Sequence, residues 1–250
     1  MDNLGHLALL LVAAFAAGAL NAVAGGGRFL TLPALVFTGV PPVVANATGT
    51  VALLPGYMAG AWGFKDDMQS PPGLSMKQVI ALSLVGGSAG AALLLFTPDE
   101  TFRKVVPWLL LAATAMFAFA PQLRAWASGQ NAGSATLKAT NTSKAAIGML
   151  IVTVYGGYFN GGLGILLLAL FGLLGQTQLN AMNGMKNLVS ALLTAIAVAI
   201  YAVGGIVEWK QALIMMVAAT LGGYLGARVA RKIPAHILRW GIVATGLVMA

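Results

Sequence analysis

The sequence contains no cysteine and only two histidines, His6 and His236. Without thiols the chain can form neither disulfides nor thiolate metal sites, and two histidines this far apart in the sequence do not make a metal cluster. Redox and zinc chemistry are therefore unsupported. We expect no metal site and no cofactor.

Charged residues are also scarce, at 8% of the chain. All six acidic residues fall in expected loops or at segment ends: Asp2, Asp66, Asp67, Asp99, Glu100 and Glu208. No carboxylate is thus expected in the apolar core to bind sodium or to relay protons. No nucleophile is paired with a base either, so we do not expect an enzyme.

Apolar residues dominate what remains, at 59% of the chain with a mean hydropathy of +0.87. The runs Val43 to Phe64, Val79 to Phe96 and Val105 to Leu123 each reach roughly the 20 residues that cross a ~30 Å hydrocarbon core. Such runs are too long for strands and predict an all-α polytopic membrane protein. The net charge of +8 comes from Lys and Arg scattered mainly through loops. These residues signal topology, and without a contiguous basic face we expect no nucleic-acid partner.

The two halves of the chain resemble each other. "GALNAVAG" at Gly18 to Gly25 and "GYFNGGLG" at Gly157 to Gly164 both read G-x-x-N-x-x-x-G. Further matches follow in the same order: Gly49 and Leu53 with Gly184 and Leu188, Lys77-Gln78 with Lys210-Gln211, "GGSAGA" at Gly86 with "GGYLGA" at Gly222, and Pro98 with Pro234. We predict two repeats, residues 1–125 and 143–250, joined by a polar cytoplasmic linker at 126–142. The "GGSAGA" and "GGYLGA" segments are interpreted as packing faces.

Charge predicts that the repeats are inverted. The loops that hold most basic residues are cytoplasmic by the positive-inside rule, which leaves Pro98 and Pro234 on opposite sides of the membrane. Each repeat is then a broken re-entrant helical hairpin followed by three transmembrane helices, with both termini periplasmic. The final segment, Ile237 to Ala250, is short of a full span, so we expect the last helix to be truncated.

The hairpins explain "NAVAGGGRFLTLP" at Asn21 to Pro33, which puts three glycines and an arginine inside an apolar segment. The stretch Arg28 to Thr38, at 1.5 Å per residue, covers about 16 Å, half the hydrocarbon thickness. Non-helical backbone at that depth survives only beside protein or a water-filled cavity. A half-helix that starts there points its free N–H groups and positive end at the cavity, so two such ends favour an anion site.

Arg28 and Lys186 are the two cations expected within the membrane. A cation at a helix N-terminus opposes the dipole and at mid-depth costs a few kcal/mol unless paired, which a bound anion would relieve. The alternatives for Arg28 are that it reaches water or pairs with a carbonyl, and for Lys186 that it snorkels to the interface.

The other candidates lie at or near the expected breaks. The complete predicted substrate-binding set is Asn21, Gly25, Gly26, Gly27, Arg28, Thr48, Asn160, Gly161, Gly162, Gly164, Asn183, Lys186 and Asn187. Each type has a structural alternative: the asparagines can cap broken helices, the glycines can shape the break, and Thr48 can bond its own helix carbonyl.

"NAVAGGGRFLTLPALVFTGVPPVVANATGT" and "GLLGQTQLNAMNGMKN" resemble the TauE/SafE sulfite exporter family of bacterial inner-membrane permeases. The resemblance spans nearly the whole chain. It implies export of a small sulfur-containing anion such as sulfite, sulfoacetate or another organosulfonate. Similar sequences usually carry a small residue, often Ser or Gly, at Arg28, which makes this arginine either a specificity feature or an altered residue.

Together these patterns predict a secondary transporter that alternates access to a midplane anion site, with the bilayer and a small anion as partners. Oligomeric state is not indicated. Two alternatives stay open: an anion-selective channel, which would show conductance and a continuous polar pore, and a membrane scaffold or assembly subunit, which would leave the glycine breaks unexplained.

Overall fold

The computed structural model describes residues 2–23, 26–119 and 142–229. All regular structure within these ranges is helical, so the all-α prediction is confirmed there. The final segment, 237–250, lies outside the described residues, as does the linker up to residue 141.

The described part of the first half contributes five α-helices and a 3₁₀ turn: α1 (Asp2–Val23), α2 (Arg28–Phe37), α3 (Pro42–Gly63), η1 (Lys65–Asp67), α4 (Met76–Leu95) and α5 (Asp99–Ala118). Local signals start two of them. Ser75 and Gln78 form a capping box at the start of α4. The Asp99 carboxylate accepts the Val43 N–H at 3.0 Å at the start of α3, where a negative charge stabilises the helix.

The described part of the second half contributes four helices: α7 (Thr142–Tyr158), α8 (Leu163–Leu173), α9 (Leu179–Val203) and α10 (Trp209–Val229). By length and composition, three segments of the described chain could cross a membrane: Leu4–Asn21, Met76–Leu95 and Asn180–Val203. Two shorter apolar helices, α2 and α8, accompany them. Such a helix set is that of a multi-pass membrane protein.

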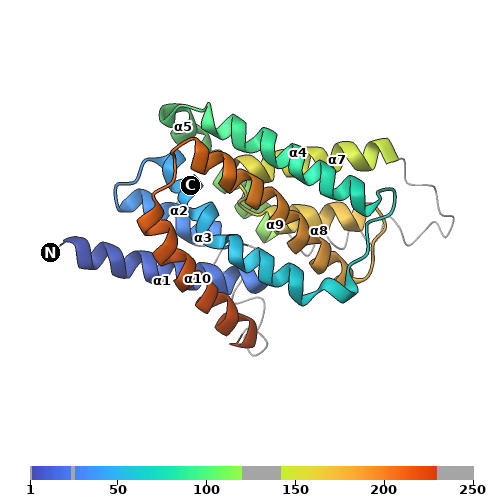
Figure 1. The fold of residues 1–250 in the computed structure, drawn as a ribbon, viewed down its shortest axis with the longest axis horizontal. Coiled ribbons are helices and arrows are strands. Elements are labelled where there is room, and N and C mark those ends of the chain that lie inside the picture. The colour runs from blue at the N-terminus through green and yellow to red at the C-terminus, as the bar shows by residue number, and fades with distance from the viewer. Residues whose placement is uncertain (1, 24–25, 120–141, 230–250) are drawn as a thin grey trace.

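Each half begins with a broken helix. Residues 26 and 27 precede α2 without belonging to a helix, and between α7 and α8 the chain turns at 159–162. In both pairs the second helix packs back on the first. Figure 1 shows α2 and α8 returning toward the end of the molecule from which α1 and α7 entered. These short helices have 10 and 11 residues, or about 15 Å of rise.

The helices pack across the halves rather than within them. Helix α1 packs on α10, α7 packs on α4, and α3 packs on α9; α3 also contacts α10, and α9 contacts α4. If α1, α3 and α4 are exchanged with α7, α9 and α10, the same set of contacts results. Figure 1 shows that α3 and α9 run in opposite directions, so that the α3–α4 and α9–α10 connections lie at opposite ends of the molecule.

Glycines bring two of these pairs into backbone contact. A Cβ on Gly18 would overlap the Ala219 carbonyl, and one on Gly222 would overlap the Phe15 carbonyl, which locks α1 to α10. At the α4–α7 contact, a Cβ on Gly90 would overlap the Val154 carbonyl. Apolar side chains fill the remaining space in two clusters, one centred on α1, α2 and α3 and the other on α7, α8 and α9.

Candidate functional site

Arg28 is the first residue of α2 and is only 2% exposed. Its Nη1 donates to the Asn46 carbonyl and its Nη2 donates to Thr50 Oγ1, so the guanidinium is held by two successive turns of α3. The burial rules out an arginine that reaches water, whereas the carbonyl partner is present. Its Nε has no hydrogen-bond partner.

Among the described residues, the surroundings of Arg28 are polar but uncharged. The tyrosines near its guanidinium are Tyr201, Tyr57 and Tyr155. Thr31, one turn further along α2, is fully buried, and its hydroxyl has no partner either. Arg28 and Thr31 therefore place a free guanidinium N–H and a free hydroxyl in one buried region, where unmet polar groups are costly.

Gly49 makes room for both side chains. A Cβ at this position would lie 3.1 Å from Thr31 Oγ1 and 3.2 Å from Arg28 Nη1. Both separations are tighter than ordinary van der Waals contact, so any side chain on this face of α3 would displace the guanidinium or the hydroxyl.

We expect Gly49→Ala to weaken anion binding about tenfold while costing about 1 kcal/mol of stability, because the added methyl group crowds the guanidinium in a close-packed core. Ligand-dependent thermal stabilisation in detergent measures the effect. Gly63→Ala is the matched control, since it lies on the same helix and its Cβ would have nothing within 4 Å. Equal ligand responses from the two variants would contradict the placement of Arg28 in the site.

The second break is shaped by residues in left-handed conformations and held by hydroxyl groups. Asn160 has φ 64° and Gly162 has φ 69°; a non-glycine residue in this region is uncommon. The Asn160 amide donates to Thr194 Oγ1 at 3.2 Å. The Tyr155 and Tyr201 hydroxyls each donate to a glycine carbonyl of this segment, at Gly161 and Gly157, both at 2.5 Å.

Helix α3 connects the two breaks. The Asn46 amide, whose backbone carbonyl holds Arg28, donates to the Tyr158 carbonyl at the end of α7 at 2.8 Å. The Tyr57 hydroxyl lies 3.5 Å from Asn160 Oδ1, and the Asn21 side chain lies near the same hydroxyl. We call this set the central polar cluster: Asn21, Arg28, Thr31, Asn46, Thr50, Tyr57, Tyr155, Asn160, Thr194 and Tyr201.

The structure thus brings Asn21, Arg28 and Asn160 of the predicted set together. Gly26 and Gly27 are buried at the start of α2 and accept its first backbone N–H groups. A Cβ on Gly27 would lie 2.6 Å from the Ala17 carbonyl of α1, so this glycine permits close packing of the hairpin. The predicted Gly25 lies outside the described residues.

The other predicted residues divide between the second break and α9. Gly161 and Gly162 lie in the turn, and Gly164 is the second residue of α8. Lys186 is 7% exposed, and helical spacing puts it on the face of α9 that carries Ser190 and Thr194. The structure does not bring Thr48 to the cluster, because its hydroxyl accepts the Glu208 N–H at 3.1 Å on another face of α3.

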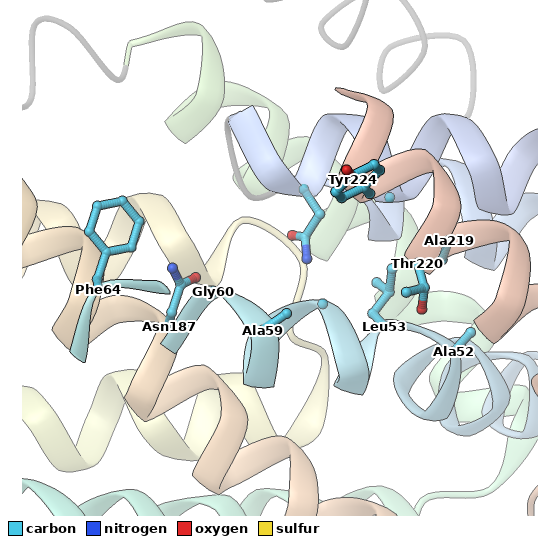
Figure 2. Close-up of a pocket in the computed structure, with 13 residues that line it drawn as sticks. Ala52, Leu53, Ala59, Gly60, Phe64, Asn187, Ala219, Thr220 and Tyr224 are labelled. Atoms are coloured by element: carbon cyan, nitrogen blue, oxygen red, sulfur yellow. The ribbon is translucent and has the colours of Figure 1, made fainter. Parts of the chain in front are cut away.

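A cavity of about 360 Å³ lies between α1, α3, α9 and α10. Glycine and alanine make up most of its wall, and the polar side chains are Asn21, Asn187, Thr220 and Tyr224. Figure 2 shows Asn187 and Gly60 beside Phe64 at one end, with Thr220 and Leu53 at the other. Asn21 lines the cavity and lies near Tyr57, so the cavity reaches the central polar cluster. Asn183 is half-buried one turn before Asn187.

The prediction missed most of the uncharged members of the cluster. Asn46, Thr50 and Tyr57 lie at intervals of four and seven residues along α3, and Thr194 and Tyr201 are seven residues apart on α9. These intervals place each group on one face of its helix. A search for polar residues at helical spacing inside apolar segments could therefore have found both groups.

Comparison with known proteins gives a family. The family described as "Sulfite exporter TauE/SafE" matches residues 10–250. A "Probable membrane transporter protein" of Haemophilus influenzae is 29% identical over 97% of this chain and 92% of its own length. "Probable membrane transporter protein ORF9" of Sinorhizobium is 29% identical over 98% and 90%, and "Probable membrane transporter protein YfcA" of Escherichia coli is 26% identical over 98% and 88%. No solved structure matches the chain.

Proposed function

The chain belongs to the TauE/SafE sulfite exporter family, and from this premise we propose that it is a secondary transporter that exports a small sulfur-containing anion across the bacterial inner membrane. The substrate is sulfite or an organosulfonate such as sulfoacetate. It binds at the central polar cluster, where Arg28 neutralises part of its charge.

The observation that carries this proposal is the state of Arg28. A guanidinium that is 2% exposed ordinarily requires a carboxylate partner, because a buried charge is costly unless paired. The partners of Arg28 among the described residues are a carbonyl and a hydroxyl, and its Nε–H is free beside the free Thr31 hydroxyl. An oxyanion would supply the missing negative charge and accept both hydrogen bonds.

The two short helices add to the same electrostatic field. Neither α2 nor α8 has a side-chain cap, so the positive dipole ends of both helices are not offset by a capping side chain and favour a nearby anion. We assign the second end, at Gly161, Gly162 and Gly164, to the same substrate. Lys186, on the buried face of α9 that carries Thr194, contributes further positive charge. Asn187 lines the cavity, and Asn183 lies one turn before it on α9.

Inverted repeats support a transport mechanism. The antiparallel course of α3 and α9 in Figure 1, together with helix contacts that survive exchange of the halves, fits two repeats of opposite topology. We place the α3–α4 connection in the cytoplasm because it is one of the loops that together hold most of the Lys and Arg residues, and such loops are cytoplasmic by the positive-inside rule. Movement of one repeat against the other would then expose the cluster alternately to each side.

A panel of ligands tests the proposal. A ligand that binds only the folded protein raises its apparent stability by RT ln(1 + [L]/Kd). The detergent-solubilised protein is melted with sulfite, sulfoacetate, taurine, sulfate, acetate and chloride salts of several cations, all at one ionic strength. We expect sulfite or a sulfonate to raise the melting temperature while acetate and the cations do not. A response to none of them would remove the sulfur-anion assignment.

A further inference from the structure

The cavity has a counterpart in the other half of the molecule. The matches of Gly49 with Gly184 and of Gly86 with Gly222 set the correspondence between α3 and α9 and between α4 and α10. Under it, the contact of α10 with α3, where the cavity lies, corresponds to the contact of α4 with α9. In a symmetric molecule these two contacts would look alike.

The contact of α4 with α9 is closed. A Cβ on Gly87 of α4 would lie 2.8 Å from Leu193 Cβ and 3.0 Å from Ile196 Cγ2, so the two helices touch with no space between them. Leu193 is fully buried there, and its neighbour Thr194 is 0% exposed.

The corresponding contact of α10 with α3 is open. Gly223 corresponds to Gly87, yet the atoms nearest to its Cβ position are those of Gly18 on α1, at 3.5 Å or more, and no atom of α3 lies within 4 Å. Met58, which corresponds to Leu193, is 57% exposed. Ala59, which corresponds to Thr194, is exposed and lines the cavity.

Two helix pairs, in contrast, are equally tight in both halves. Glycines also lock α7 to α4, in a register one turn away: a Cβ on Gly157 would overlap the Gly87 carbonyl, whereas one on Gly18 would overlap the Ala219 carbonyl. The asymmetry of the cavities therefore lies in how each locked pair sits against the central helices α3 and α9, since both pairs are in backbone contact.

We propose that the α4–α9 contact is a second access cavity, closed in this structure, which opens when the present cavity closes. The α1–α10 pair moves onto α3 until Gly223 packs against Met58 as Gly87 now packs against Leu193. The α4–α7 pair then leaves α9 and exposes Thr194, which bonds Asn160 at the second break. Because α3 and α9 are antiparallel, the two cavities open at opposite ends. This inference rests on the proposed transport function.

The chain has no native cysteine, so single reporter cysteines can be read without background. Ala59→Cys and Thr194→Cys are the matched pair, and both are probed with a water-soluble maleimide. We expect Ala59→Cys to react at least tenfold faster than Thr194→Cys. Adding Gly87→Ala, whose methyl group fits only when α4 leaves Leu193, should slow the Ala59→Cys reaction and accelerate the Thr194→Cys reaction, each by about tenfold. Gly223→Ala, which fits the present arrangement, should produce no such exchange.

A second variant keeps the proposal testable if Gly87→Ala unfolds the protein and both reporters react together. In the double variant Met58→Cys with Gly223→Cys, an oxidant should form a disulfide that then protects an Ala59→Cys reporter in the same chain. Failure of this disulfide to form, or unchanged reactivity of both reporters with Gly87→Ala, would overturn the second cavity. None of these readouts needs a ligand. If no anion raises the melting temperature but the two cysteine reporters change in opposite directions, the sulfur-anion assignment fails while the proposal of two alternating cavities stands.

Discussion

Arg28→Met is expected to abolish the stabilisation of the protein by its anion while leaving the ligand-free protein as stable as before, or more so. The two effects separate because Arg28 has no carboxylate partner among the described residues. Methionine has a similar length and fills the buried space, and the Asn46 carbonyl keeps the Thr50 hydroxyl as a donor at 2.7 Å. Removing a buried cation also removes its desolvation cost.

The expected loss of affinity is at least 100-fold, or about 2.7 kcal/mol, since the variant loses both the opposite charge and a charge-assisted hydrogen bond. The affinity of Arg28→Lys should lie between those of the unchanged protein and Arg28→Met. An ammonium keeps the charge but cannot donate to Asn46 and Thr50 at the same time in the way the guanidinium does. Isothermal titration with the most stabilising anion measures each affinity.

Arg103→Met is the control, since Arg103 is exposed on α5. It removes the same charge from the chain and should change affinity less than twofold. A large loss of ligand-free stability in Arg28→Met, with affinity unchanged, would make Arg28 a structural residue and remove it from the anion site.

Gly222→Ala is expected to lower the melting temperature by about 10 °C. The new Cβ would overlap the Phe15 carbonyl of α1, and a backbone atom in a helix cannot rotate away as a side chain can. Overpacking of this kind costs up to about 3 kcal/mol, which in a chain of this size shifts the midpoint by about 6–12 °C. Thermal unfolding in detergent measures it.

The neighbouring glycine supplies the control. Gly223 lies on the same helix at the same depth, but the nearest atom to its Cβ position is the Gly18 carbonyl oxygen at 3.5 Å, an ordinary contact. Gly223→Ala should therefore keep the melting temperature or raise it slightly, because alanine favours helix by up to about 1 kcal/mol over glycine. Similar losses in both variants would mean that α1 and α10 are not locked at Gly222.

The sequence predicted much of the fold because the signals were local. Apolar length placed α3 and α4, and the glycine runs marked the turns before Arg28 and Leu163, since glycine interrupts a helix through its own backbone freedom. The packing of "GGSAGA" and "GGYLGA" against partner helices followed from residue size alone. Which helices they meet could not be predicted, because that depends on contacts between residues more than 60 positions apart.

The candidate site was harder to predict for the same reason. Arg28 and the two asparagines stand out because they are polar residues at helix breaks. Tyr57 and Tyr201 looked like ordinary aromatic residues of apolar helices, and only the fold shows that their hydroxyls face the breaks. Thr48 lies on another face of α3, where its hydroxyl accepts the Glu208 N–H, and its distance from Asn46 and Thr50 around the helix follows from their spacing.

The polar face of α3 makes the two breaks thermodynamically linked. Asn46 accepts a hydrogen bond from Arg28 through its backbone carbonyl and donates one to the Tyr158 carbonyl through its side-chain amide. One residue is therefore bonded to the first residue of α2 and to the end of α7. Linkage is reciprocal. If an anion that draws Arg28 away from Asn46 alters the second break by some free energy, then any rearrangement of the second break changes the affinity of the anion by the same amount. Asn46 would in this way carry cooperativity between the two halves, with Tyr57 as a second link beside Asn160.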